Sequence, residues 1–231
     1  MPFLDDSGPR PEEEHGILWR STALIGEQLE RMILLNIAWA IHSVPVIVAW
    51  AYPNFPLYLR VAFLLYSAFA FIPATAALFA SLAQVSDGIP LDAEMVAANL
   101  RERFVSSFLK LLPLYSLFYW LYLLSTFAAQ NNILLLDVFS RLLILTLAVF
   151  SVHWGGLYAQ SPHLSALKIA SASAALFWRK PAVTLLTALL CFIALVIGII
   201  SIGGMFLIVP VLIALIQIQS YRISVSDHKG N

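Results

Sequence analysis

The sequence predicts an all-α membrane protein, a polytopic helical bundle with six transmembrane helices. They are arranged as three hairpins, each preceded by a cytoplasmic amphipathic helix. Of the 231 residues, 61% are apolar and 11% are charged, whereas soluble domains have about 45–50% apolar and about 25% charged residues. Several stretches contain the roughly 20 apolar residues that a helix needs to cross a bilayer. The basic residues also alternate between the connecting segments, as membrane topology requires.

The two ends of the chain are predicted to be tails around one transmembrane domain at 17–222. Residues 1–16 are acidic and contain proline. They differ from a secretory signal, which has a basic start and an early apolar run, so we expect a flexible tail that is not cleaved. Residues 223–231 form a polar tail. The net charge of zero argues against nucleic acid as a partner.

The apolar stretches predict spans at 32–52, 57–83, 108–128, 133–158, 181–200 and 203–221. The links PNFP, AQNN and SIGG join them in pairs, and links this short force neighbouring helices to run antiparallel. The link of the last hairpin is the shortest. A re-entrant pair at this hairpin, leaving four full spans, is the alternative.

The basic residues predict the orientation of these spans. With both termini on the inner side, Arg60 and Arg141 lie on the outer side or in the outer half of the membrane. The other eleven lie on the inner side: Arg10, Arg20, Arg31, Arg101, Arg103, Lys110, Lys168, Arg179, Lys180, Arg222 and Lys229. This bias follows the rule that cytoplasmic segments are enriched in Lys and Arg.

A segment with helical apolar spacing precedes each hairpin, and these segments predict amphipathic helices on the inner side. They begin near Ile17, Leu91 and Leu164, at separations of 74 and 73 residues. An equal period is typical of three copies of one unit. The alternative is that any six-helix protein with two long inner loops has this pattern.

The clearest candidate for a binding site is a charged pair in the fourth span. Asp137 and Arg141 are four residues apart and therefore share a helix face. Arg60, near the outer end of the second span, is expected at the same depth. Because charged groups inside a membrane are costly, these three residues are candidates for binding an anionic substrate group such as a uronate or a phosphate. The alternative is a structural ion pair that joins the second and fourth spans.

Other polar residues and the prolines within the spans are interpreted as structural. Interhelical hydrogen bonds are expected for Asn36, His42 and His153. Helix bends, which a membrane bundle tolerates, are expected at Pro45, Pro73, Pro113 and Pro210. Cys191 is the single cysteine, so a disulfide within the chain and a cysteine metal site are excluded.

The sequence lacks the phosphate-binding, dinucleotide-binding, zinc-protease and serine-hydrolase motifs GxxxxGK[ST], GxGxxG, HExxH and GxSxG. We therefore expect a protein that is not an enzyme, with no catalytic residue, no metal and no cofactor.

Several motifs resemble the YesL-like family of small bacterial membrane proteins, a domain of unknown function. Leu35-Asn36 is followed by Trp39 and Pro45, and Pro73-Ala74-Thr75-Ala76-Ala77-Leu78 comes in the second span. Further matches are Phe104, Phe108 and the stretch FWRKP at 177–181. The chain departs from the family at Ile72, where the family usually has glycine. The following loop, SDGIPLDAEM, also starts acidic, whereas family members often carry more basic residues there.

The resemblance implies a bacterial plasma-membrane protein. Members are often encoded near carbohydrate uptake and degradation systems, which implies an accessory or regulatory role in carbohydrate uptake. The expected partners are the lipid bilayer and either a carbohydrate ABC transporter or a second copy of this chain. The alternative function is a small-solute transporter or channel with its site near Asp137 and Arg141.

Overall fold

The computed structural model describes residues 16–52 and 54–226, and these ranges contain helices and turns but no strand. The helices are α1 (Ile17–Glu27), α2 (Leu29–Ala40), the 3₁₀ helix η2 (Ile41–Ser43), α3 (Val44–Ala51), α4 (Leu57–Val85), α5 (Ala93–Gln130), α6 (Leu134–Ser151), α7 (Trp154–Gln160), α8 (Ala166–Arg179), α9 (Pro181–Ile200), α10 (Ile202–Leu207) and α11 (Val209–Ser226). The all-α fold class is confirmed. Residues 1–15 and 227–231 of the two predicted tails lie outside the described ranges, and α11 continues past the expected domain end at 222.

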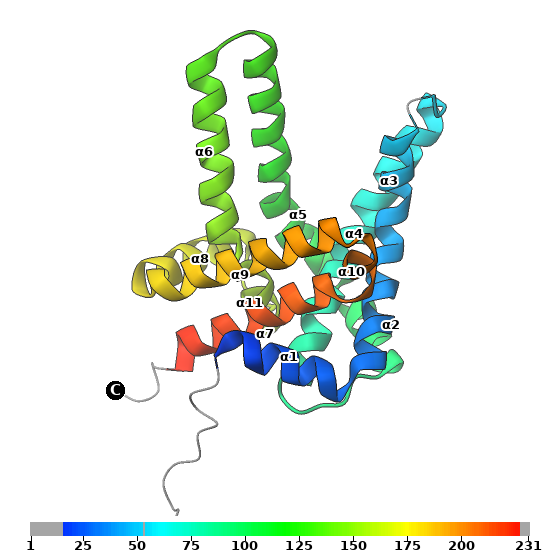
Figure 1. Cartoon of the computed structure of the whole chain (residues 1–231), viewed down its shortest axis with the longest axis vertical. Coiled ribbons are helices and arrows are strands. Elements are labelled where there is room, and N and C mark those ends of the chain that lie inside the picture. Colours follow the sequence, from blue (N-terminus) through cyan, green and yellow to red (C-terminus); the bar gives the residue numbers. More distant parts are fainter. Residues whose placement is uncertain (1–15, 53, 227–231) are drawn as a thin grey trace, which may run out of the picture.

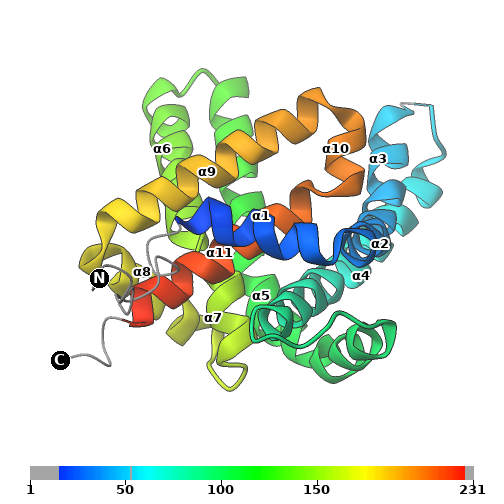
Figure 2. The ribbon, with the colours of Figure 1, turned by 60° about the horizontal axis from the view of Figure 1, so that its bottom comes forward.

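Two helical hairpins project from a packed base (Figure 1). One consists of α3 and the start of α4, and the other of the second half of α5 with α6. Helix α11 lies in the base, where it packs against α1, α4, α7 and α9. Helices α9 and α11 lie side by side and run across the direction of α6 (Figures 1 and 2).

Helix α4 is divided into an exposed half and a buried half. Near its start, Leu57 and Tyr58 are 74% and 72% exposed, whereas Ala76 and Leu82 are both fully buried. The small residues after Pro73 allow neighbouring helices to approach closely, and α4 packs there against α5, α7 and α11. The buried half of α4 is therefore the central element of the base.

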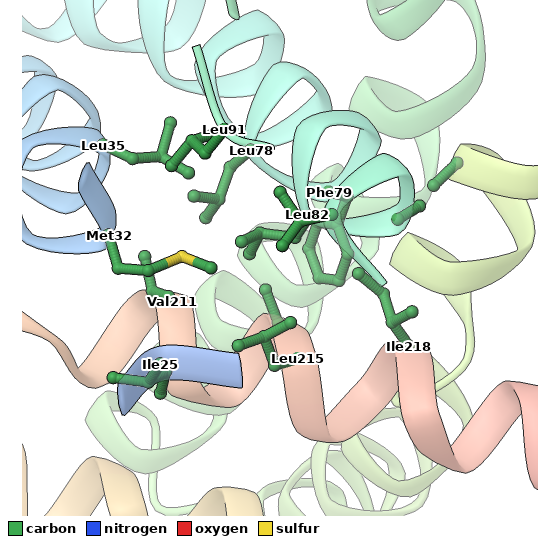
Figure 3. Packing of buried hydrophobic residues seen from close by; sticks show 14 residues of the cluster. Ile25, Met32, Leu35, Leu78, Phe79, Leu82, Leu91, Val211, Leu215 and Ile218 are labelled. Carbon is green, nitrogen blue, oxygen red and sulfur yellow. The ribbon is translucent and has the colours of Figure 1, made fainter. Parts of the chain in front are cut away.

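The main hydrophobic core forms where α4 meets α11 (Figure 3). Leu78, Phe79 and Leu82 of α4 lie in one buried cluster with Val211 and Leu215 of α11. The cluster is closed by Ile25, Met32, Leu35, Leu91 and Ile218. It thus joins residues from both ends of the chain, which fixes α1 and α2 against the last helix.

The predicted boundary between an amphipathic helix and a span at residue 108 is absent. Helix α5 is continuous over 38 residues, which at 1.5 Å per residue is about 57 Å. The charged residues at 101–103 do not interrupt it, because Arg and Glu are good helix formers. Since a bilayer core is about 30 Å thick, part of α5 must lie outside that core.

Three other predicted spans are interrupted helices. The first breaks at the 3₁₀ turn η2 before Pro45, the fourth at 152–153, and the last at Ile208 before Pro210. Proline removes a backbone donor and opposes helix continuation, which accounts for the first and last breaks. Pro73 and Pro113, by contrast, lie inside continuous helices.

The third pair differs from the projecting hairpins. Helix α9 has the predicted bounds of 181–200. The short helix α10 connects it to α11, which packs back along α9. The apolar part of α11, Val209–Val225, is shorter than the long apolar helices of the chain. The expected order of an amphipathic helix and two spans is not kept in the second unit, because α5 joins the amphipathic helix and the span in one helix. The three units are also packed differently.

Candidate functional site

The predicted charged pair forms at the start of α6. Arg141 Nε donates a hydrogen bond to Asp137 Oδ1 at 2.8 Å. Ser125 Oγ on α5 donates to the same oxygen at 2.6 Å. The Asp137 side chain is 15% exposed and that of Arg141 is 64% exposed. The carboxylate therefore joins α5 to α6, rather than the second span to the fourth. The guanidinium lies on the surface of the α5–α6 hairpin.

Arg60 is placed in the other hairpin. It lies near the start of α4, where its Nη2 donates to the Tyr52 carbonyl at 3.2 Å. The tips of the two projecting hairpins are separated in both views (Figures 1 and 2). The structure thus brings Asp137 and Arg141 together but not Arg60. A role of these residues in binding substrate stays a prediction.

Arg141 shares its face of α6 with exposed apolar side chains. Leu134, Val138 and Leu145 lie on this face by helical spacing and are 75%, 47% and 64% exposed. In the described residues, the two Nη groups of Arg141 make no hydrogen bond. This face of α6 therefore combines an exposed apolar surface with the two Nη groups of Arg141, which can still donate hydrogen bonds.

Helix α6 has little of its apolar surface covered by the protein, whereas the short helix α7 that follows it is buried. Of the residues in the most apolar part of Leu134–Gln160, 11% are buried, compared with 41% for the most apolar part of α4. The second half of α5 is similarly exposed at Tyr119, Trp120 and Phe127. The α5–α6 hairpin thus presents apolar side chains to whatever surrounds it.

The two histidines within the predicted spans make separate interhelical contacts. His42 Nδ1 lies 3.1 Å from Tyr66 Oη on α4. His153 is fully buried and its Nε2 lies 2.9 Å from Thr184 Oγ1 on α9. These contacts support the structural interpretation of both residues.

Asn36 is fully buried where the last predicted span breaks. Its Nδ2 donates to the Phe206 carbonyl at 2.7 Å, and its Oδ1 accepts from the Val211 N–H at 3.1 Å. These backbone groups flank the end of α10 and the start of α11, where helical partners are missing. One side chain thus satisfies both sides of the break and ties it to α2.

A polar cavity of about 640 Å³ in the base is lined by Arg103, Arg222, Asp87 and two glutamines. In the sequence, these two arginines indicate only the predicted topology. Arg222 donates to the Ala83 and Ser86 carbonyls at 3.0 and 2.8 Å, and to Asp87 Oδ1 at 2.7 Å. Because its partners are more than 130 residues away in the chain, no local pattern points to this role.

The charges around this cavity offset one another. Arg103 Nη1 donates to the Ala159 carbonyl at 3.2 Å, close to the end of α7. Arg222 similarly meets the end of α4. Helix C-termini carry partial negative charge, and Asp87 adds a full one. The arginines thus satisfy helix ends, and the cavity has no clear surplus of positive charge for an anion.

The class of protein follows from the helices. In the described part of the chain, five stretches are long and apolar enough to cross a membrane: Leu29–Ala49, Leu57–Val85, Ala93–Gln130, Leu134–Gln160 and Pro181–Ile200. They indicate a helical membrane protein whose apolar helices contact the lipid bilayer. Within the same residues, no group of three or more His, Cys, Asp and Glu side chains is placed to hold a metal ion.

Comparisons of the chain with protein-family models, with curated proteins and with solved structures gave no match. The resemblance to the YesL-like family therefore stays a prediction.

Proposed function

We propose that this protein is a multi-pass protein of the bacterial plasma membrane and a non-enzymatic accessory or regulatory subunit of a carbohydrate uptake system. In this proposal six spans form three hairpins, of which the last, α9 with α10 and α11, crosses the direction of the other two (Figures 1 and 2), and both termini are cytoplasmic. The distribution of basic residues supports the orientation, and the sequence resemblance supports the link to carbohydrate uptake.

The α5–α6 hairpin is the observation that carries this proposal. Apolar surface alone does not drive helix association in lipid, so contacts between membrane helices depend on close packing and polar groups. Arg141 supplies such a group next to Val138 and Leu145, and it has donors left after binding Asp137. A partner helix with a hydrogen-bond acceptor at this depth would fit the Arg141 face.

The positions of Arg60, Asp137 and Arg141 agree better with an accessory role than with transport of a solute at these three residues. The cavities of about 600 and 640 Å³ in the base are lined by none of Arg60, Asp137 and Arg141. Arg141 instead lies on the outer surface of its hairpin. The pair is therefore better placed to meet another protein than to enclose a solute.

Photo-cross-linking in native membranes tests the proposal. A photoreactive residue at Leu145, on the Arg141 face, is expected to give an adduct with the membrane subunit of a carbohydrate importer. Arg141→Gln is expected to reduce that adduct about tenfold, since a hydrogen bond to a charged group contributes about 1.5–3 kcal/mol. Uptake of the sugar should fall in parallel.

Leu189 on α9 provides the matched control, because it is a leucine of similar exposure, 53% against 64%. A photoreactive residue there should give no importer adduct. Equal adducts at both positions would overturn the proposal. So would an adduct containing only a second copy of this chain, which would assign the face to self-association.

A further inference from the structure

A second large cavity, of about 600 Å³, lies between α2 and the start of α5. Its walls are apolar: Leu34, Leu35 and Ala38 on α2, and Val96, Ala97 and Leu100 on α5. A smaller cavity of about 70 Å³ shares four of these residues and is also lined by His42 and α4. The two cavities are neighbours along α2, and we refer to them together as the apolar groove.

The groove has a charged mouth, formed by Arg31 and Asp92. Arg31 Nη1 donates to the Leu91 carbonyl at 2.9 Å. Gln28 Oε1 accepts the Leu91 N–H at 2.7 Å. These two bonds hold the segment before α5 against α2. The mouth is therefore a fixed part of the base.

Both charged groups at the mouth are available to a ligand. Within the described residues, Arg31 uses one Nη atom for the Leu91 carbonyl and makes no other hydrogen bond. Asp92 forms no hydrogen bond or ion pair through its carboxylate in the same residues. Both residues are exposed. A ligand at the mouth thus meets one cation and one anion.

The length of the groove suits an extended apolar chain. Ala38 lies seven residues and His42 eleven residues beyond Arg31 on the α2–η2 stretch, which at 1.5 Å per residue is about 10 and 16 Å. Both walls belong to helices apolar enough to cross a membrane. Leu34 at the rim is 66% exposed, so the groove opens on the surface of these helices.

We propose that this groove binds one acyl chain of a phospholipid whose headgroup carries a primary ammonium group. Arg31 binds the lipid phosphate, because guanidinium donors match phosphate oxygens. Asp92 accepts hydrogen bonds from the ammonium group. Basic pockets between membrane helices on the cytoplasmic side are known headgroup sites, and the adjacent carboxylate adds the selection for a zwitterionic lipid.

The two charges discriminate among common headgroups. A phosphatidylglycerol would place its negative charge next to Asp92 without supplying a cation. A phosphatidylcholine supplies a cation but has no N–H to donate to the carboxylate. Phosphatidylethanolamine satisfies both side chains, so it should bind most tightly.

Native mass spectrometry of the full chain in detergent tests this proposal, with the three lipids at matched acyl chains. Wild type should bind phosphatidylethanolamine about tenfold more tightly than phosphatidylglycerol. Asp92→Asn should remove this tenfold preference, which corresponds to about 1.4 kcal/mol, since it removes the negative charge that accepts hydrogen bonds from the ammonium group. Ala97→Trp, at an exposed wall position, should block binding of all three lipids by filling the groove.

Glu94→Gln is the matched control, because Glu94 is an exposed acid of α5 outside the groove lining. It should leave the preference unchanged. The proposal is overturned if wild type binds the ethanolamine and glycerol lipids equally. It is also overturned if Ala97→Trp, with an unchanged melting temperature, leaves lipid binding intact.

Discussion

Single polar side chains in this protein bind backbone groups that the helices leave free. Asn36 is the clearest case, because its amide binds the Phe206 carbonyl and the Val211 N–H across the break before α11. Arg222 does the same for carbonyls at the end of α4. Asp137 instead accepts from two side chains, Ser125 and Arg141. These side chains therefore have a structural role, because their hydrogen bonds join helices to one another.

Replacing Asn36 tests this explanation. Asn36→Ala removes these two hydrogen bonds and leaves the partly buried Phe206 carbonyl and the buried Val211 N–H without that partner. We expect the free energy of unfolding to fall by about 1–3 kcal/mol, measured by reversible denaturation in detergent. Asn131→Ala is the control, because Asn131 is exposed and, within the described residues, its side chain bonds only to the Phe127 carbonyl at the end of the preceding helix α5. Equal effects of the two changes would contradict the role of Asn36.

Among the elements, α4 has two halves with different environments although both are apolar in sequence. The first half belongs to a projecting hairpin, and the second half packs against α5, α7 and α11. Gly155 and Gly156 allow α7 to fit between Phe79 and Tyr221. The packing of the base therefore depends on the second half of α4.

Two leucines of α4 test this division. Leu82 is fully buried and Leu65 is 55% exposed. Leu82→Ala should lower the free energy of unfolding by about 2–5 kcal/mol, because it leaves a cavity in the core. Leu65→Ala should change it by much less, about 0.5 kcal/mol or less, as for other surface substitutions. Chemical denaturation in one detergent would measure both, and a larger effect at Leu65 would refute the packing of α4.

Across the whole molecule, the sequence predicts the bounds of a helix well where the length of an apolar stretch and helix-breaking residues next to it define that helix. Residues 181–200 are predicted as a span and form α9, and the predicted 57–83 becomes α4, which ends at Val85. The Asp137–Arg141 pair is also predicted, because i, i+4 spacing is local. These features depend on residues that are close in sequence.

Features that depend on distant residues are not predicted. Asn36 is predicted to make an interhelical hydrogen bond, but its partners at the break before α11 lie 170 and 175 residues away in the chain, and no local pattern indicates them. The crossing of α9 and α11 over the direction of α6 results from packing in the base (Figure 1). The groove joins Arg31 and Asp92, whose proximity no sequence pattern indicates. Both the polar cavity and the apolar groove therefore exist only in the folded chain and have no local signature in the sequence.

The proposed membrane topology places the α5–α6 tip and the base on opposite sides of the membrane. Both proposed sites depend on it, because the partner face lies near this tip and the groove lies at the base. Cysteine labelling of intact cells tests it most directly, after Cys191→Ser removes the native thiol. Asn131→Cys at the tip and Gly203→Cys, where a side chain meets open space, should react with an impermeant reagent from outside. Glu94→Cys should react only after the membrane is opened. Labelling of Asn131→Cys and Glu94→Cys from the same side would contradict the account.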